Sequence, residues 1–243
     1  MPETIPLFDR RNDMRLDDKV IVVTGAFGQL GRAVTSELLR QRACAVMLDI
    51  HEGVAPEGAH AWTVDLASLA DTRAVMNEIA ERFGRIDGLV NVAGGFTWKT
   101  LDDSDDLSEW QRMYAINTMT CVTASRAALP HLVEGDGARI VNIGAAGALR
   151  ANAGMGAYAA SKSAVARFTE ALADELKIRN VTVNAVLPGI IDTPTNRADM
   201  PDADFNAWVT PQDIADVIVF LLSDAARSIT GALLPVTGGL TRV

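Results

Sequence analysis

The sequence has few cysteines and histidines, and neither type is spaced for a metal or redox site. The two cysteines, Cys44 and Cys121, lie in separate segments, so two buried, reduced thiols are expected rather than a disulfide. The three histidines, His51, His60 and His131, are equally scattered and form no zinc motif. The composition therefore indicates a reducing compartment and predicts no metal site.

Long apolar runs are also lacking. The longest, residues 217–222, is far too short to span a membrane, and the first residues have no apolar core of the signal-peptide type. Basic side chains are in the minority, 22 against 31 acidic ones, for a formal net charge of −9. That charge repels phosphate backbones. We therefore expect a cytoplasmic protein that binds a small molecule, and neither membranes nor nucleic acid.

Apolar, β-branched runs alternate with amphipathic helical stripes along the 243 residues. Strands are expected at 19–25, 43–48, 88–92, 138–143, 181–186 and 233–236, and helices at 31–41, 69–83, 107–132, 158–177 and from 211. Such alternation implies an α/β fold, with a doubly wound parallel sheet and helices on both faces. No repeat or linker divides the chain. Residues 1–15 are expected to be an N-terminal extension, and 16–243 a single domain.

A glycine-rich turn follows the first expected strand and leads directly into the first helix. It contains Gly25, Gly28, Gln29, Leu30 and Gly31. Glycines at such a turn let the backbone approach a pyrophosphate, which then binds at the N-terminus of the helix. The turn predicts a dinucleotide site, although glycines here also fit a role in packing alone.

Asp49 closes the second expected strand, roughly 20 residues beyond the glycine turn, where dinucleotide-binding folds place an acidic residue. A carboxylate there accepts hydrogen bonds from the adenosine ribose and repels the additional phosphate of NADP. Ile50 and His51 follow, so no Arg or Lys offsets the repulsion. The sequence therefore predicts NAD, with NADH preferred over NADPH. The alternative is that Asp49 only caps a turn.

Tyr158 and Lys162 are one helical turn apart on the same face of an expected helix. A free tyrosine has a pKa of about 10, and a nearby ammonium favours the phenolate and lowers that pKa. The pair is thus suited to donate or accept a proton near neutral pH. Taken alone, the same spacing also fits a surface pair.

Considered together, these features resemble the short-chain dehydrogenase/reductase family from about residue 16 to residue 243. The resemblance rests on the loop 24–31, Asp49, Asp65, Leu66, residues 91–94, Asn117, Tyr158, Lys162, Pro188, Gly189 and residues 229–231, in this order. It implies a Rossmann-type, seven-stranded parallel sheet. It also implies a homodimer or homotetramer, with the helices at 107–132 and 158–177 as contact surfaces.

The resemblance also implies a role for each matching residue. Tyr158 would be the general acid, Lys162 would lower its pKa and hold the nicotinamide ribose, and Asn117 would position a water for a proton relay. The adenine would be bordered by Asp65 and Leu66. The remainder of the cofactor site would comprise Asn91, Ala93, Gly94, Pro188, Gly189 and Ile191. For Asp65, Asn91 and Asn117, capping of the local backbone is the alternative.

Two departures from the family pattern point to a particular branch. Gln29 stands where the largest branch has its middle glycine, and Ala145 stands at the position of the catalytic serine. Losing one oxyanion donor typically costs about 2.7–4 kcal/mol of barrier. Both departures, and the stretch 191–208, resemble dihydropteridine reductase, which prefers NADH. A quinonoid pterin accepts hydride into a conjugated ring system, so the hydroxyl would be dispensable.

The substrate site expected from this resemblance is lined by Ala145, Phe96, Met155 and Trp208, with Trp98 beside them. Ordinary packing of these side chains is the alternative, and the segment 193–211 is expected to be a short lid over an open pocket. The main hypothesis is therefore an NAD(H)-dependent oxidoreductase acting on a small organic substrate such as a quinonoid dihydropteridine. A general carbonyl or alcohol reductase is one alternative, and a non-catalytic NAD-binding regulatory protein is another.

Overall fold

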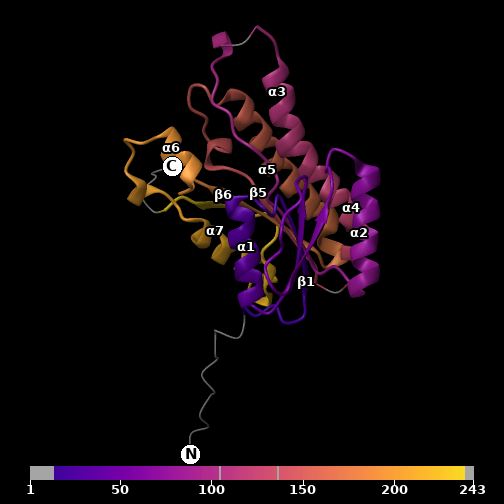
Figure 1. Ribbon diagram of the computed structural model, residues 1–243. Coiled ribbons are helices and arrows are strands. Elements are labelled where there is room, and N and C mark those ends of the chain that lie inside the picture. The colour runs from indigo at the N-terminus through magenta and orange to yellow at the C-terminus, as the bar shows by residue number, and fades with distance from the viewer. Residues whose placement is uncertain (1–13, 104, 136, 239–243) are drawn as a thin grey trace, which may run out of the picture.

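Seven parallel strands form one sheet in the order β3-β2-β1-β4-β5-β6-β7 (Figure 1). The computed structural model describes residues 14–103, 105–135 and 137–238. The strands are β1 (Val20–Thr24), β2 (Cys44–Asp49), β3 (Ala59–Thr63), β4 (Gly88–Asn91), β5 (Arg139–Ile143), β6 (Thr182–Pro188) and β7 (Leu233–Val236). The strand order reverses direction between β1 and β4. Sheets of this kind bind ligands at such a reversal, beyond the carboxyl ends of the strands.

The helices cover the sheet on both faces. They are α1 (Gln29–Arg40), α2 (Leu69–Phe83), α3 (Ser108–Met113), α4 (Thr120–Glu134), α5 (Gly156–Leu176), α6 (Pro194–Asp199) and α7 (Pro211–Leu222). One core lies between the sheet and helices α1 and α7, and a second lies between the sheet and helices α2, α4 and α5 (Figure 1). The doubly wound α/β architecture expected from the sequence is thus confirmed.

The middle strands are buried along their whole length because helices pack on both of their faces. β1, with the sequence VIVVT, is fully buried, as are β5 and β6. Alternate residues of β1 enter opposite cores: Ile21 and Val23 pack towards α1 and α7, and Val20 and Val22 pack towards α2 and α4. Continuous apolar runs are typical of such strands.

Local hydrogen bonds set the ends of two helices where the sequence predicts them. The Ser68 side chain accepts the Asp71 amide at the start of α2, and Gly84 ends that helix in the left-handed conformation. Thr210 and Asp213 form a reciprocal capping box at the start of α7. These contacts satisfy amides and carbonyls that a helix terminus would otherwise leave unpaired.

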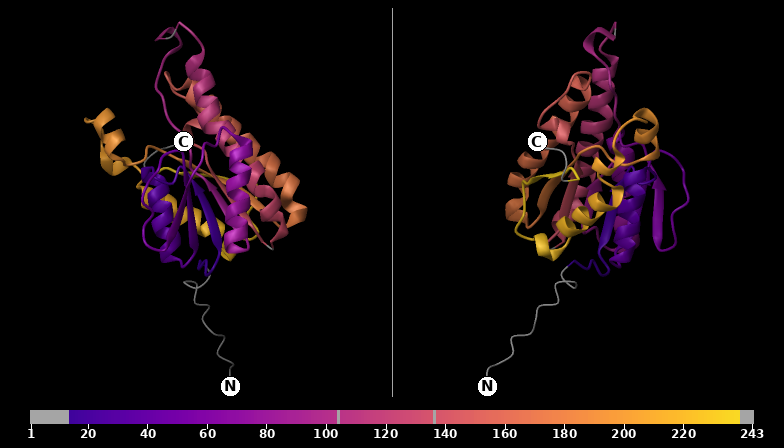
Figure 2. Two further views of the ribbon diagram at one scale, coloured as in Figure 1. Left: turned by 45° about the vertical axis from the view of Figure 1, so that its right-hand side comes forward. Right: turned by 90° about the vertical axis from the view of Figure 1, so that its left-hand side faces the viewer.

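Two expectations about secondary structure are corrected by the structure. β3 was not expected, because at the sheet edge its residues are only partly buried and form no continuous apolar run. The single helix expected at 107–132 is divided into α3, a π-helical turn η2 (Tyr114–Met119) and α4. The segment after β4 and helix α3 project beyond the carboxyl edge of the sheet (Figure 2).

Five short 3-10 helices complete the fold of the residues that the structure describes. They are η1 (Leu101–Asp103), η3 (Ala146–Ala148), η4 (Lys177–Arg179), η5 (Phe205–Ala207) and η6 (Asp224–Ala226). No helix within the described ranges is both long and apolar enough to cross a bilayer. Residues 1–13 of the expected N-terminal extension lie outside the described residues.

Candidate active site

The glycine turn after β1 packs directly on the turn after β4. Gly25 has a φ of +60°, and a Cβ atom on it would lie 2.7 Å from the Cα atom of Ala93. A Cβ atom on Gly31 would lie 2.3 Å from the carbonyl oxygen of Gly25. No side chain fits at either position without moving the backbone. Gly28 is the N-cap of α1. The turn thus brings bare backbone and a helix N-terminus to the carboxyl edge of the sheet, where both are suited to hold an anion.

Asp49 lies beside this turn at the end of β2. One carboxylate oxygen of Asp49 accepts the Phe27 amide at 2.9 Å, and the other accepts the His51 amide at 3.1 Å. Each oxygen keeps a second lone pair for a ribose hydroxyl. The next strand end carries Asp65, whose Oδ1 accepts the Ala67 amide at 2.9 Å, followed by the buried Leu66. Both carboxylates therefore cap turns.

The end of β4 is tied to β1 and to the interior. The Thr24 hydroxyl accepts the amides of Val92 and Ala93, each at 3.1 Å. The Asn91 side chain points inward and donates to Asn142 Oδ1 at 2.9 Å. Asn91 thus connects adjacent strands through its side chain, and only its backbone is available at the turn.

Asn117 holds the turn after β4 against helix α5. Its Oδ1 accepts the Gly95 amide at 2.9 Å, and its Nδ2 donates to the Gly95 carbonyl and to Ser161 Oγ, each at 3.0 Å. Ser161 in turn donates to the Tyr158 carbonyl at 2.7 Å. The amide group of Asn117 is therefore engaged with the protein, so its side chain joins Gly95 to the start of the Tyr158 helix.

Lys162 extends from α5 to the end of β5. Its side chain is 5% exposed, and Nζ donates to the Ile143 carbonyl at 2.8 Å. Burial lowers the pKa of Lys162 to about 8, although the nearby Cys121 acts in the opposite direction. At pH 7 the side chain is consequently still protonated, and it carries its charge in a buried environment.

The pKa of Tyr158 differs from the sequence expectation. Burial raises the pKa of this phenol to about 12, whereas the neighbouring ammonium of Lys162 was expected to lower it. Among the described residues, none forms a hydrogen bond with the phenol. Its ring instead meets the ring of Phe96 edge-on, with the centroids 4.9 Å apart. Desolvation therefore accounts for the raised pKa of Tyr158, and the lowering expected from Lys162 is not seen.

The residues expected around the substrate lie on different segments near Tyr158. Ala145 follows β5 and is buried, so the position of the family serine carries only a methyl group. Met155 is the N-cap residue of α5. Phe96, on the turn after β4, is 54% exposed despite its contact with the phenol. These three residues lie at the ends of β4 and β5 and at the start of α5.

The segment after β6, expected to be a short lid over an open pocket, is held by a strand bridge and by internal hydrogen bonds. β6 ends at Pro188, followed by Gly189, and Ile191 forms a parallel bridge with Val209. Within the segment, Arg197 forms two hydrogen bonds with the Asp192 carboxylate, at 2.5 and 2.7 Å.

The aromatic residues of this segment pack on each other. The guanidinium of Arg197 lies 4.6 Å from the centre of the Phe205 ring. Trp208 is 9% exposed, and its ring packs on Phe205 with the centroids 4.8 Å apart. Trp208 therefore belongs to the internal packing of this segment, whereas Phe96 is exposed beside the phenol.

Residues 19–204 match the family model described as short chain dehydrogenase. The chain belongs to this family. It is 32% identical to 2-(S)-hydroxypropyl-CoM dehydrogenase 3 of Xanthobacter autotrophicus, over 94% of this chain and 99% of the relative. It is 35% identical to meso-2,3-butanediol dehydrogenase of Serratia marcescens, over 94% and 96% of the two chains. The ligand-free structure of Thermoplasma acidophilum aldohexose dehydrogenase superposes with a TM-score of 0.86 at 29% identity, over 94% and 95% of the chains.

Membership of this family makes the protein an oxidoreductase that uses a nicotinamide cofactor. The family expected from the sequence is therefore confirmed. The three relatives carry the names of dehydrogenases of hydroxyl compounds, which fits the general carbonyl or alcohol alternative better than a pteridine substrate. The likeness to the dihydropteridine reductase branch stays a prediction.

Three residues at the site were not foreseen. Thr24 and Ser161 fix the backbone of the site through their hydroxyls, and Cys121 is buried near Lys162, with its thiol 3.4 Å from Asn142 Oδ1. Burial raises the pKa of Cys121 to about 12, so it is a neutral thiol. Ser161 directly precedes Lys162 in the sequence, so its place in the site could have been predicted. Thr24 opens the loop 24–31 on which the family resemblance rests, but that loop did not predict the role of its hydroxyl, and nothing local distinguishes Cys121.

Proposed function

We propose that this protein interconverts a small carbonyl compound and the corresponding alcohol, with NAD(H) as its preferred cofactor. One observation carries the proposal. A Cβ atom on Gly94 would lie 2.4 Å from Asn117 Oδ1 and 3.3 Å from Lys162 Nζ. Side chains from η2 and α5 thus meet the turn after β4 at the point where the sheet order reverses. Polar groups that converge beyond the carboxyl ends of parallel strands indicate a ligand site.

The described residues fit a dinucleotide. The turn 25–31 and the N-terminus of α1 would hold the pyrophosphate, since Gly25, Gly28 and Gly31 carry no side chains there. Asp49 would bind the adenosine ribose, and its charge favours NAD over NADP. The remaining contacts would come from Asp65, Leu66, the backbone of residues 91–94, and residues 188–191. The bound nicotinamide supplies or accepts the hydride.

The side chains of the protein would handle the proton. The Tyr158 phenol would donate a proton to the carbonyl oxygen during reduction and take it back during oxidation. Lys162, protonated at pH 7 and buried, would stabilise the phenolate that remains. Asn117 would hold the turn after β4 and the Tyr158 helix in register, by the hydrogen bonds described above.

A substrate screen with NADH and NADPH in parallel tests this proposal. We expect turnover of small ketones or secondary alcohols, faster with NAD(H). Tyr158→Phe should abolish turnover and leave NADH binding within about twofold of the native value, because only the proton donor is lost. Turnover that is indifferent to this substitution would overturn the catalytic assignment. Tight NADH binding without turnover of any substrate would instead favour the non-catalytic alternative.

A second candidate substrate is a planar, conjugated acceptor such as a quinonoid dihydropteridine. Two observations favour it. Ala145 offers no hydroxyl to a developing oxyanion, and the exposed aromatic ring of Phe96 stands on the turn beside the phenol. A flat ring would stack on such a side chain. Good turnover of ketones beside no detectable rate with NADH and quinonoid dihydropterin would exclude this candidate.

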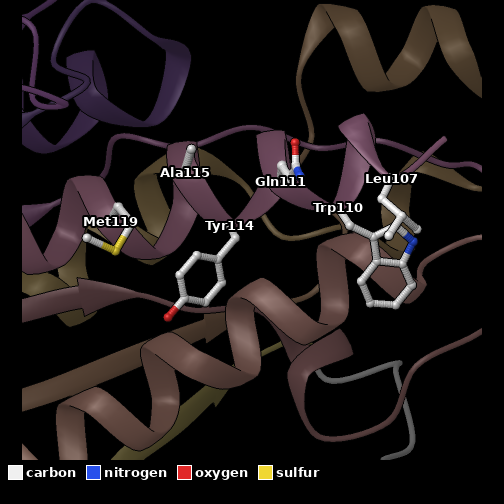
Figure 3. A pocket seen from close by; sticks show the side chains of 6 residues that line it. All are labelled: Leu107, Trp110, Gln111, Tyr114, Ala115 and Met119. Atoms are coloured by element: carbon white, nitrogen blue, oxygen red, sulfur yellow. The ribbon is translucent and has the colours of Figure 1, made fainter.

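We also propose a homodimer or homotetramer, in which α3 and η2 form a contact surface. A groove of about 430 Å³ runs along these elements, lined by Leu107, Trp110, Gln111, Tyr114, Ala115 and Met119 (Figure 3). Leu107, Trp110, Tyr114 and Met119 are all exposed along this groove, and a contiguous apolar patch of this kind is typical of an interaction site. Light scattering after gel filtration should show the oligomer, and Tyr114→Glu with Met119→Glu should convert it to a monomer.

Two further expectations complete the proposal. Residues 16–243 would act as one domain. A cytoplasmic location is supported by Cys44 and Cys121, which are both free thiols, as is usual in a reducing compartment. Fractionation of the cells that make the protein tests the location.

A further inference from the structure

Successive residues of the loop 94–99 contact the groups that hold the proposed catalytic residues in place. Gly95 bonds with Asn117, Phe96 packs on the Tyr158 ring, and the next residues reach the segment that leads into α5. We infer that Trp98 is a positioning residue that holds this segment, and with it the phenol, in place. The inference rests on the proposed role of Tyr158 and assigns Trp98 a task other than lining the substrate.

The contact between Trp98 and Gly154 is direct. A Cβ atom on Gly154 would lie 2.3 Å from Cε2 and 2.4 Å from Nε1 of the indole, so the ring lies where any other residue would place its side chain. Gly154 also has a φ of +76°, which disfavours every residue with a Cβ atom. The Lys99 amide donates to the Gly154 carbonyl at 2.7 Å. Two adjacent residues of the loop therefore hold one glycine, four residues before Tyr158.

A second indole holds the same segment from α3. A Cβ atom on Gly156 would lie 3.2 Å from Cζ2 of Trp110. Gly156 is the first residue of α5, and Met155 between the two glycines is its N-cap residue. The start of the helix that carries Tyr158 and Lys162 is thus held between two tryptophans from two different elements.

Trp98 is exposed, so burial of its ring in a core does not explain why a tryptophan stands at this position. The side chain is 60% exposed, so one part of the indole contacts Gly154 while the remainder faces outwards. An indole in the core would lose most of its surface. What Trp98 provides is therefore its local contact with the segment.

The phenol needs such support in this chain. Among the described residues, no side chain or backbone group forms a hydrogen bond with it, and Ala145 has no hydroxyl to orient it or the substrate. Its one ring contact is Phe96, from the same loop that carries Trp98. A shift of the loop would therefore move the ring contact and the helix start together. A misplacement of about 1 Å at a reacting group can cost roughly 10²-fold in rate.

Trp98→Ala, Trp98→Phe and the control Trp62→Ala test the inference. Trp62 is a less exposed tryptophan on β3, where it donates to Glu78 and packs on Phe83. For Trp98→Ala we expect kcat to fall about 10- to 100-fold, with KM and the Kd of NADH changed by less than about threefold. Trp98→Phe should recover most of kcat, because a smaller ring still covers Gly154. Trp62→Ala should lower Tm and leave kcat unchanged.

Hydrogen exchange supplies a readout that does not depend on turnover. In Trp98→Ala the amides of residues 97–100 and 150–157 should exchange faster than in the native protein, and they should be unaffected in Trp62→Ala. If Trp98→Ala does not fold, Gly154→Ala displaces the indole from the other side and should give the same pattern.

Different results would overturn the inference and the proposed function. A rise in KM with unchanged kcat and unchanged exchange would make Trp98 a substrate-lining residue and sink the inference. Unchanged kinetics and exchange would sink it equally. A native protein without turnover of any substrate would overturn the proposed function, while the exchange experiment would still decide whether Trp98 holds the segment.

Discussion

Burial of the Lys162 ammonium predicts that this lysine destabilises the protein at neutral pH. Its side chain is 5% exposed, and burial lowers its pKa from 10.5 to about 8. At 1.36 kcal/mol per pKa unit, that change corresponds to about 3 kcal/mol of free energy spent on keeping the charged form in the folded state. Lys162→Met keeps the apolar stem and removes the charge, so it should raise the free energy of unfolding at pH 7.

The lost hydrogen bond reduces the gain. Nζ donates to the Ile143 carbonyl at 2.8 Å, and an unsatisfied carbonyl costs about 1 kcal/mol or more. The net stabilisation is therefore about 2 kcal/mol, or roughly 4–8 °C in Tm for a chain of this size. Activity should be lost in the same variant. A gain in stability combined with loss of function is expected where an active site holds a strained or buried charge.

The pH dependence of stability distinguishes the cost of the buried ammonium from a general change in packing. Below pH 8, Lys162 is protonated in both states and the folded state bears the full cost. Between pH 8 and 10.5 the unfolded chain still binds the proton and the folded protein does not, so the stability of the native protein rises with pH. The difference in Tm between Lys162→Met and the native protein should therefore shrink from pH 7 to pH 10. Scanning calorimetry at several pH values measures it, and a difference that is absent at pH 7 or independent of pH would refute the reasoning.

Three further predictions concern the cofactor and substrate sites. Ala145→Ser should raise kcat for a ketone about 10²-fold and leave kcat for a quinonoid pterin almost unchanged, because only the ketone develops an oxyanion that the hydroxyl can bind. Equal effects on the two substrates in parallel steady-state assays would refute this. Asp49→Asn should raise the kcat/KM for NADPH relative to that for NADH about five- to tenfold, since about 1 kcal/mol of charge repulsion is removed. An unchanged ratio would exclude a role of Asp49 in the choice of cofactor. Gly31→Ala should lower the free energy of unfolding by about 1–3 kcal/mol in a urea titration, because its Cβ atom would lie 2.3 Å from the Gly25 carbonyl oxygen. A stable variant with native NADH affinity would contradict the close packing of the turn.

The parts of the fold that the sequence predicts well are those in which burial leaves a simple pattern. β1 and β6 are buried on both faces, so each is a continuous apolar run. The capping residues Ser68 and Thr210 act through hydrogen bonds to amides three residues away, so local sequence contains the whole signal. β3 has neither advantage. At the edge of the sheet it is partly exposed, and its residues alternate without an apolar run.

The site could be predicted only to the level of which residues gather there. Parallel strands place their carboxyl ends along one edge, so the order of motifs brings the glycine turn, Asn117 and Lys162 near each other. The contacts among them depend on distances that the sequence does not contain. Gly154 and Trp98 are far apart in the chain, and their contact depends on the path of both loops. The pKa of Tyr158 is likewise set by the apolar surface around the phenol, which spacing to Lys162 does not reveal.

The buried ammonium and the absence of a serine hydroxyl bear on the same step. In the proposed reduction, Tyr158 would give up its proton in a buried environment that raises the pKa of the phenol to about 12. Position 145 offers only a methyl group, so in the proposed mechanism the stabilisation of that phenolate would depend on Lys162. A charge acts more strongly where water is excluded, because the effective dielectric constant is lower there. In the proposed mechanism, the cost of burying Lys162 at neutral pH would therefore be the cost of placing an ammonium in a buried part of the site. The contact of Phe96 with the phenol and that of Trp98 with Gly154 would hold the segment that carries Tyr158 in place.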